Sequence, residues 1–234
     1  MRHLAFAALA ALTITAPSLA KPRSPKVAAV DTPQAAAAKE DAARYLEAIR
    51  RLDDDPAGPQ INAVIAFNPD APRLAGEMAA TGHLRGRTVL VKDNIETREF
   101  ATTAGSLALA DNRTGRDAPL VAKLRAEGGV VLGKTNLSEW ANIRGSRSSS
   151  GWSGVGGQTR NPHAIDRNPC GSSSGTGAAI SANLAAAGVG SDPAGQRVAP
   201  YGGTEALFLH EQRVPFEVIP GVPAAIASAA ASGC

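Results

Sequence analysis

The chain has 234 residues, of which 44% are hydrophobic and 19% are charged, and its formal net charge is +3. This composition is typical of a globular protein with one or two domains, and it argues against an intrinsically disordered chain. The basic excess is scattered, and no run of Lys and Arg is interleaved with aromatic residues, so we expect a solvated surface and no nucleic-acid partner.

The first twenty residues have the pattern of a secretory signal peptide. Arg2 and His3 form a short basic start, residues 4–16 are almost wholly apolar, and residues 18–20 are Ser, Leu and Ala. A transmembrane helix needs about 20 apolar residues, whereas Pro17 ends this run earlier. We therefore predict a signal peptide over residues 1–20, export to the periplasm or the medium, and no membrane attachment after cleavage.

The next part of the chain predicts helices and strands in alternation. Residues 21–33 are rich in Pro, Lys and Ala without an apolar period, which indicates an exposed leader. Residues 35–52 favour a helix, because Tyr45, Ile49 and Leu52 recur on one face. Residues 61–67 are a short apolar run before a turn and predict a strand, and a second helix is expected over 72–80.

A lysine ends the next predicted strand. Residues 88–91 (TVLV) have the β-branched content of a buried strand and lead directly into Lys92. A helix over 117–127 and a strand over 130–133 follow. This order predicts an α/β domain with a central sheet that is partly parallel or mixed.

Residues 144–177 are crowded with Gly and Ser. A flexible linker is one interpretation of such composition, but Trp152 and Pro162 interrupt it with residues that linkers seldom carry. A small-residue helix is expected over 178–187. A Gly/Ser loop ahead of a helix directs backbone N–H groups toward one point, which suits an anion or a developing oxyanion.

Cysteine and histidine are too sparse to suggest a disulfide framework or a metal site. The chain has two cysteines, Cys170 and Cys234, and four histidines that are isolated from one another. Their spacing fits no common set of metal ligands. We therefore predict neither a disulfide scaffold nor a bound metal.

Five blocks of sequence together resemble the amidase signature family. In the family's order and spacing they are residues 86–94 (GRTVLVKDN), 102–106 (TTAGS), 133–140 (GKTNLSEW), 157–162 (GQTRNP) and 170–175 (CGSSSG). The resemblance covers about residues 35–190. It implies a truncated α/β amidase-signature fold with a mixed central sheet covered by helices, a small-molecule amide substrate that is hydrolysed to an acid and ammonia or an amine, and no cofactor.

The resemblance also implies the candidate site residues. The family's hydrolases use a Ser, cis-Ser, Lys triad, in which a lysine that burial keeps neutral is the base and a second serine relays the proton. By resemblance, Lys92 matches the base, and Ser172 matches the relay serine that follows a cis peptide bond. Gly171, Ser173 and Gly195 match positions that bind the substrate or its oxyanion.

The position of the nucleophile does not match. An ungapped alignment of residues 190–196 (GSDPAGQ) places Gln196 where the family has its attacking serine, and Ser191 where it has a threonine. Glutamine has no hydroxyl group, and Pro193 removes a backbone donor. We therefore expect this chain to be inactive as an amidase. The alternative is a non-catalytic truncated or fused fragment.

The last part of the chain departs from the family. Residues 201–207 (YGGTEAL) and 214–222 (VPFEVIPGV) resemble an internal stretch of tetrapyrrole methyltransferases. A fusion or frameshift near residue 190 would explain this, and a divergent tail is the alternative. A methyltransferase fragment using S-adenosylmethionine is a less favoured hypothesis, because the nucleotide-binding half is absent. The predicted segments are a signal peptide (1–20), a leader (21–33), a partial amidase-signature domain (34–190) and a divergent tail (191–234).

Overall fold

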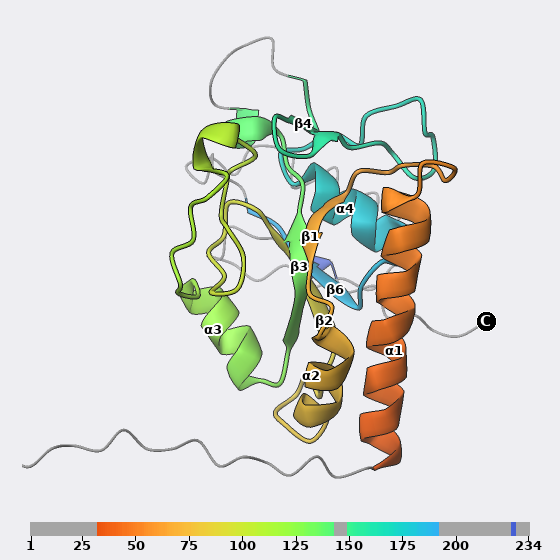
Figure 1. The fold of residues 1–234 in the computed structure, drawn as a ribbon, viewed down its shortest axis with the longest axis vertical. Helices are drawn as coiled ribbons and strands as arrows, with labels where there is room; N and C mark the ends of the chain where they lie inside the picture. The colour runs from red at the N-terminus through yellow and green to blue at the C-terminus, as the bar shows by residue number, and fades with distance from the viewer. Residues whose placement is uncertain (1–31, 143–148, 192–225, 228–234) are drawn as a thin grey trace, which may run out of the picture.

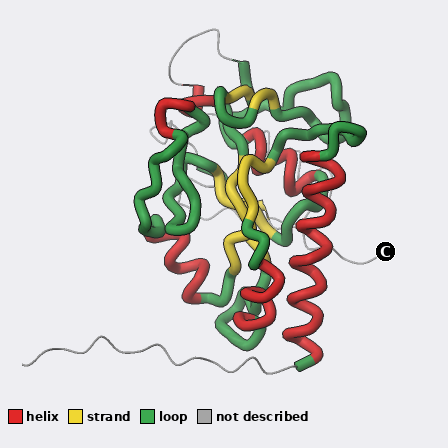
Figure 2. The backbone as a smooth tube through the Cα atoms, viewed as in Figure 1, coloured by secondary structure: helices red, strands yellow, loops and turns green. Residues whose placement is uncertain are grey.

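A mixed β-sheet forms the centre of the protein (Figures 1 and 2). The computed structural model describes residues 32–142, 149–191 and 226–227. The strand order is β1-β3-β2-β6-β7; β2 is parallel to β3 and β6, and the edge strands β1 and β7 are antiparallel to their neighbours. The strands are β1 (Val64–Phe67), β2 (Thr88–Lys92), β3 (Val130–Thr135), β6 (Ala187–Val189) and β7 (Ile226–Ala227).

Helices cover both faces of this sheet (Figure 1). The helices α1 (Pro33–Ile49), α2 (Ala71–Met78) and α4 (Ser174–Ser181) share one apolar core with the sheet, and α3 (Pro119–Ala126) shares a second core on the other side. Helix α1 begins at Pro33, and the Thr32 hydroxyl accepts the Ala35 N–H at 3.1 Å as an N-cap. The predicted α/β class with a mixed sheet covered by helices is confirmed.

Short elements complete the described chain. A π-helical turn, Arg50–Asp54, extends α1, a 3-10 turn spans Leu107–Leu109, and Glu139–Asn142 is a turn in which Trp140 and Ala141 have positive φ. The small hairpin of β4 (Trp152–Ser153) and β5 (Gly157–Gln158) lies in the predicted Gly/Ser region. This region is therefore a folded loop that contacts the sheet, and the linker interpretation is wrong for its described part.

Alternation along β2 decides which side chains reach which face. Val89 and Val91 pack in the core that contains Val121 of α3, whereas Leu90 belongs to the core on the opposite face. Because successive side chains of a strand point to opposite faces, Lys92 lies on the same face as Leu90. That is the face covered by α4.

The predicted helix over 178–187 is wrong in its bounds. Helix α4 begins earlier, at Ser174, and ends at Ser181, and Ala187–Val189 is the strand β6. This strand forms because it pairs with β2, about a hundred residues earlier in the chain. A run of small residues carries no local signal for such a partner. The strand predicted over 61–67 also starts later, at Val64, and the helix predicted over 35–52 changes to a π-helical turn after Ile49.

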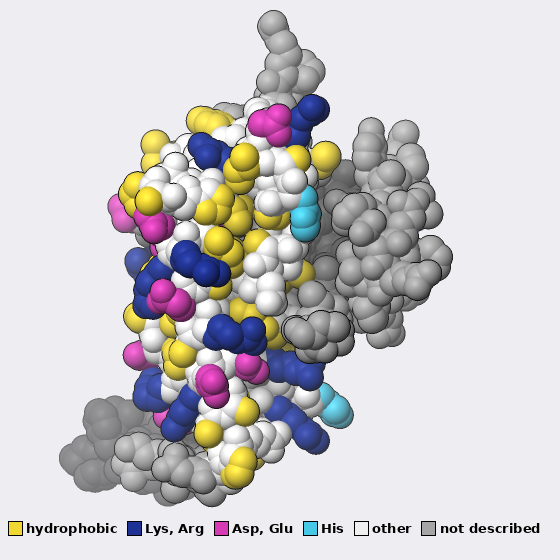
Figure 3. Space-filling model, turned by 90° about the vertical axis from the view of Figure 1, so that its right-hand side faces the viewer, with side chains coloured by type: hydrophobic (Ala, Val, Ile, Leu, Met, Phe, Trp, Pro, Cys, Tyr) yellow, Lys and Arg dark blue, Asp and Glu magenta, His cyan; other side chains and the backbone are white. Residues whose placement is uncertain are grey.

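The charged side chains form no large patch of one sign on the face drawn in Figure 3, where Lys and Arg are interspersed with Asp, Glu and apolar groups. None of the helices within the described ranges is long and apolar enough to span a bilayer. The predicted signal peptide, nearly all of the predicted leader, and the tail apart from residues 191 and 226–227 lie outside the described residues.

Candidate active site

The lysine at the end of β2 is fully buried, with 0% of its surface exposed. Its Nζ donates to Ser172 Oγ at 2.8 Å and to the carbonyl oxygen of Ser191 at 2.8 Å. Lys92 and Ser172 are 80 positions apart in the sequence, and the strand end and the loop before α4 bring them together. The two residues that the sequence predicted as base and relay therefore lie in hydrogen-bond contact.

The loop that carries Ser172 has an unusual backbone, with a cis peptide bond between Gly171 and Ser172. The Ser138 N–H donates to the Ser172 carbonyl at 3.0 Å, which attaches this loop to the segment after β3. A Cβ at Gly171 would lie 2.6 Å from Ser138 Oγ and closer still to Ser174 Oγ. A side chain at Gly171 would therefore require both serine hydroxyls to move.

Ser173 links the start of α4 to the end of β6. Its Oγ donates to the Ser191 carbonyl at 3.2 Å and accepts the Ser191 N–H at 3.2 Å. The Ser191 hydroxyl in turn exchanges hydrogen bonds with the Asn94 amide at 2.8 and 3.1 Å. Ser191 therefore presents its carbonyl to Lys92 and its hydroxyl to Asn94.

The structure thus gathers four of the predicted site residues, Lys92, Gly171, Ser172 and Ser173, at one end of the sheet. Gly195 and Gln196, the predicted oxyanion and nucleophile positions, lie outside the described residues. The contact of Asn94 with Ser191 was not anticipated. Its sequence signal was available, because Asn94 belongs to the same block as Lys92.

Asn136 is a second residue that sequence reasoning passed over. Its side chain is fully buried, and it donates to the Gly157 carbonyl at 3.1 Å and to Thr159 Oγ1 at 3.0 Å, while its Oδ1 accepts from Ser153 Oγ at 2.6 Å. Its backbone carbonyl accepts the Gly175 N–H at 3.0 Å. Asn136 therefore joins the Gly/Ser loop to the start of α4, and one N–H of that helix start bonds within the protein.

A buried ion pair lies on the opposite face of β2 from Lys92. Lys134 Nζ is 3.2 Å from Asp93 Oδ1, and both side chains are 1% exposed. Burial lowers the pKa of Lys134 and raises the pKa of Asp93, and the attraction between the two charges opposes both shifts. The sequence signal for Lys134 is the same as for Lys92, a lysine at the end of an apolar strand.

No metal cluster is found in the part of the chain that the structure describes, where no three His, Cys, Asp or Glu side chains are grouped to hold an ion. The one described cysteine, Cys170, is a free and exposed thiol. The side chains of Lys92, Ser172, Asn94 and Ser191, which bond to one another here, supply amine, hydroxyl and amide groups. These are suited to proton transfer and hydrogen bonding.

Comparison with known proteins identifies the family. The family model named Amidase matches residues 25–198. A relative from Arabidopsis thaliana, named a probable amidase, is 41% identical over 167 residues, which are 67% of this chain and 31% of that protein. One chain of the glutamyl-tRNA(Gln) amidotransferase of Thermus thermophilus is 42% identical over 159 residues, with the same coverage of 67% and 31%.

Solved structures agree with this match. The peptide amidase of Stenotrophomonas maltophilia superposes with a TM-score of 0.63 at 50% identity, over 66% of this chain and 33% of that chain. The fold is thus that of the amidase-signature enzymes, and the chain belongs to the amidase family. It spans about one third of the length of the relatives that it matches.

Proposed function

We propose that this chain carries the proton-transfer half of a Ser/cis-Ser/Lys amidase site, with Lys92 as the general base and Ser172 as the relay. The observation that carries the proposal is the 2.8 Å contact between the buried Lys92 Nζ and Ser172 Oγ. Proton transfer between side chains requires this separation. The family match supports hydrolysis of a small-molecule amide as the reaction.

The chemistry that we propose has two steps. A nucleophilic serine hydroxyl attacks the amide carbon and forms an ester, while its proton passes through Ser172 to the neutral Lys92 amine and then to the departing ammonia or amine. Water then cleaves the ester to the acid by the reverse proton path. Burial favours the neutral amine that the first step needs, because a desolvated ammonium is costly. No step uses a cofactor.

We further propose that this chain has no appreciable turnover. The position of the attacking serine is occupied by Gln196, which has no hydroxyl to acylate, and Pro193 lacks an N–H for the oxyanion. Gly171, Ser173 and Gly195 remain candidates for binding the substrate or its oxyanion. The alternative is a non-catalytic fused fragment. It predicts that Lys92 has no role even when the sequence after Gly190 is replaced by that of an active family member.

The test compares the chain with a chimera in which the sequence after Gly190 is replaced by the corresponding part of the Stenotrophomonas maltophilia peptide amidase. Ammonia release from peptide amides and from simple aliphatic and aromatic amides is measured for both. We expect no activity from the chain itself and activity from the chimera. Lys92→Ala and Ser172→Ala should each remove that activity, and Lys123→Ala, at an exposed position on α3, should not.

Two results would contradict the proposal. Turnover by the original chain that disappears in Lys92→Ala would show that another group attacks in place of the missing serine. A folded chimera whose activity survives Lys92→Ala would remove Lys92 from the mechanism.

We also propose that the protein is exported, because residues 1–20 have the basic, apolar and small-residue parts of a signal peptide. N-terminal sequencing of exported protein should begin at or near Lys21. Recovery of soluble cytoplasmic protein that begins at Met1 would contradict this proposal.

A further inference from the structure

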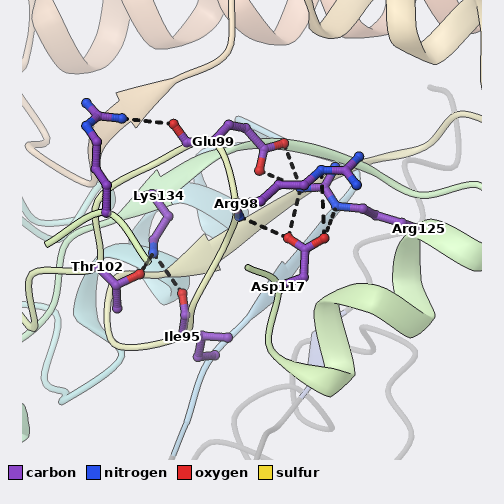
Figure 4. A network of polar contacts seen from close by, with 8 residues as sticks. Ile95, Arg98, Glu99, Thr102, Asp117, Arg125 and Lys134 are labelled. Carbon is purple, nitrogen blue, oxygen red and sulfur yellow. Dashed lines mark hydrogen bonds and ion pairs between the residues drawn. The ribbon is translucent and has the colours of Figure 1, made fainter. Parts of the chain in front are cut away.

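Lys134 is held by three groups beneath the loop that follows β2. Besides Asp93, its Nζ donates to the Ile95 carbonyl at 2.7 Å and to Thr102 Oγ1 at 3.1 Å (Figure 4). The ammonium therefore donates two hydrogen bonds, to Ile95 and Thr102, and forms an ion pair with Asp93 Oδ1. Because both side chains of the pair are 1% exposed, it is a buried ion pair and not a surface contact.

Asp93 connects this arrangement to the neighbouring backbone. Its Oδ2 accepts the Thr103 N–H at 3.1 Å and also the Thr103 hydroxyl, and its own N–H donates to the Thr135 carbonyl at 3.1 Å. These contacts of Asp93 hold the segment 92–94 in place from the face of the sheet opposite Ser172. Its two outer residues face the candidate site, where Lys92 contacts Ser172 and Asn94 contacts Ser191.

We propose that the buried Lys134–Asp93 ion pair is a positioning element of this site, which holds the segment that carries Lys92 and neutralises the carboxylate next to it. The inference rests on the proposed role of Lys92 as the base. Lys134 is a positioning residue and not a catalytic one, because its contacts lie on the opposite face of the sheet from Ser172.

The electrostatic part of the inference follows from the order of charges. An unpaired Asp93 carboxylate would favour the ammonium form of Lys92, and the Lys134 charge cancels this effect. Because Lys92 and Asp93 are adjacent and point to opposite faces, their charges lie on the order of 10 Å apart. At an effective dielectric constant of about 20, their interaction would shift the titration midpoint of Lys92 by about one pH unit. The charges of Glu96 and Glu99 also raise the pKa of Lys134. Each of them is itself paired, because Glu96 accepts a hydrogen bond from Arg116 and Glu99 accepts one from Arg125 of α3.

The experiment measures the titration of Lys92 directly in the full chain. The ¹³Cε shift of Lys92 is followed by NMR against pH in lysine-labelled protein, and the signal is assigned by its absence in Lys92→Ala. We expect the midpoint to rise by about one pH unit in Lys134→Met, to fall by about one in Asp93→Asn, and to return toward the wild-type value when both changes are combined. Lys123→Met, an exposed position of α3, is the matched control and should cause no shift.

The signs of these shifts decide the question. A merely structural role would move the Lys92 midpoint in the same direction in both single variants, or in neither, and either result would overturn the inference. If Lys134→Met does not fold, the Lys92 midpoints of Asp93→Asn and of the double variant are compared instead. Equal midpoints in these two variants would overturn the inference. A wild-type midpoint at the ordinary value of about 10.4 would instead contradict the proposed base, and the comparison of variants would remain valid.

Discussion

The carboxylate of Asp53 is expected to make the stability of this protein depend on pH in the direction opposite to most carboxylates. Asp53 is 3% exposed, and it accepts the Ala63 N–H at 2.7 Å and the Val64 N–H at 2.9 Å. Burial raises its pKa to about 6, although the two backbone hydrogen bonds act to lower it and the charge of Asp54 adds to the rise. The folded protein therefore holds this proton more tightly than the unfolded chain does.

The sign and size of the effect follow from the two pKa values. The unfolded value is about 3.9, so the contribution to stability is complete below about pH 4 and is lost as the pH rises through about 6. Two pH units correspond to about 3 kcal/mol in total, of which about 2 kcal/mol is lost between pH 4 and pH 7.5. Asp53→Asn removes the titration and keeps one of the two acceptors.

The assay is urea denaturation of the wild type and Asp53→Asn near pH 4 and near pH 7.5. Near pH 4 the variant should be less stable by about 2 kcal/mol, because it loses one hydrogen bond. Near pH 7.5 the difference should be close to zero, because the variant no longer buries a charge. Asp55→Asn, at an exposed neighbour, controls for the loss of one negative charge. A difference between wild type and Asp53→Asn that is equal at both pH values, or larger near pH 7.5, would refute the reasoning.

Three further substitutions test the packing of the fold. Gly171→Ala should destabilise the protein by about 1–3 kcal/mol in urea denaturation, because the Ser138 and Ser174 hydroxyls must move away from the new Cβ, and a loss below about 0.5 kcal/mol would contradict that packing. Gly177→Ala, in α4 with nothing within 4 Å of the new Cβ, should instead stabilise it by about 0.5–1 kcal/mol, and any loss of stability would show that the site is not open. Arg125→Ala should cost about 2 kcal/mol, with a smaller cost in high salt, because Arg125 is 15% exposed and bonds to Asp117 at 3.0 Å and to Glu99 at 2.6 Å (Figure 4). Lys123→Ala on the same helix is the control for Arg125, and an equal effect of the two would exclude the ion pairs as the cause.

The elements that the sequence predicted well are those with a local signal. Helix α1 has an apolar stripe, and β2 and β3 have β-branched runs, so their centres were located correctly. The strand β6 was missed, because its residues are Ala, Gly and Val and its stability comes from pairing with β2. Long-range pairing of this kind leaves no trace in a short window of sequence.

The candidate site was predictable only where a residue breaks a local rule. Lys92 is noticeable because an apolar strand ends in a charge, and its contact with Ser172 had to come from family resemblance, since 80 residues separate the two. Lys134 breaks the same rule, yet its partner Asp93 could not be inferred without the register of β2 against β3. The network of Asn136 consists mostly of bonds to the backbone, which depend on the path of loops.

The position of β2 in the sheet has a consequence for how the chain folds as it is synthesised. β2 is the central strand of the described sheet, and both of its neighbours, β3 and β6, come later in the chain. One edge of β2 can pair once residue 135 is available, but the other edge waits until residue 189. Until then an apolar strand with an unpaired edge is open to other chains, which favours association between nascent molecules. A ribosome pausing between these two points would therefore prolong the period in which this edge stays unpaired.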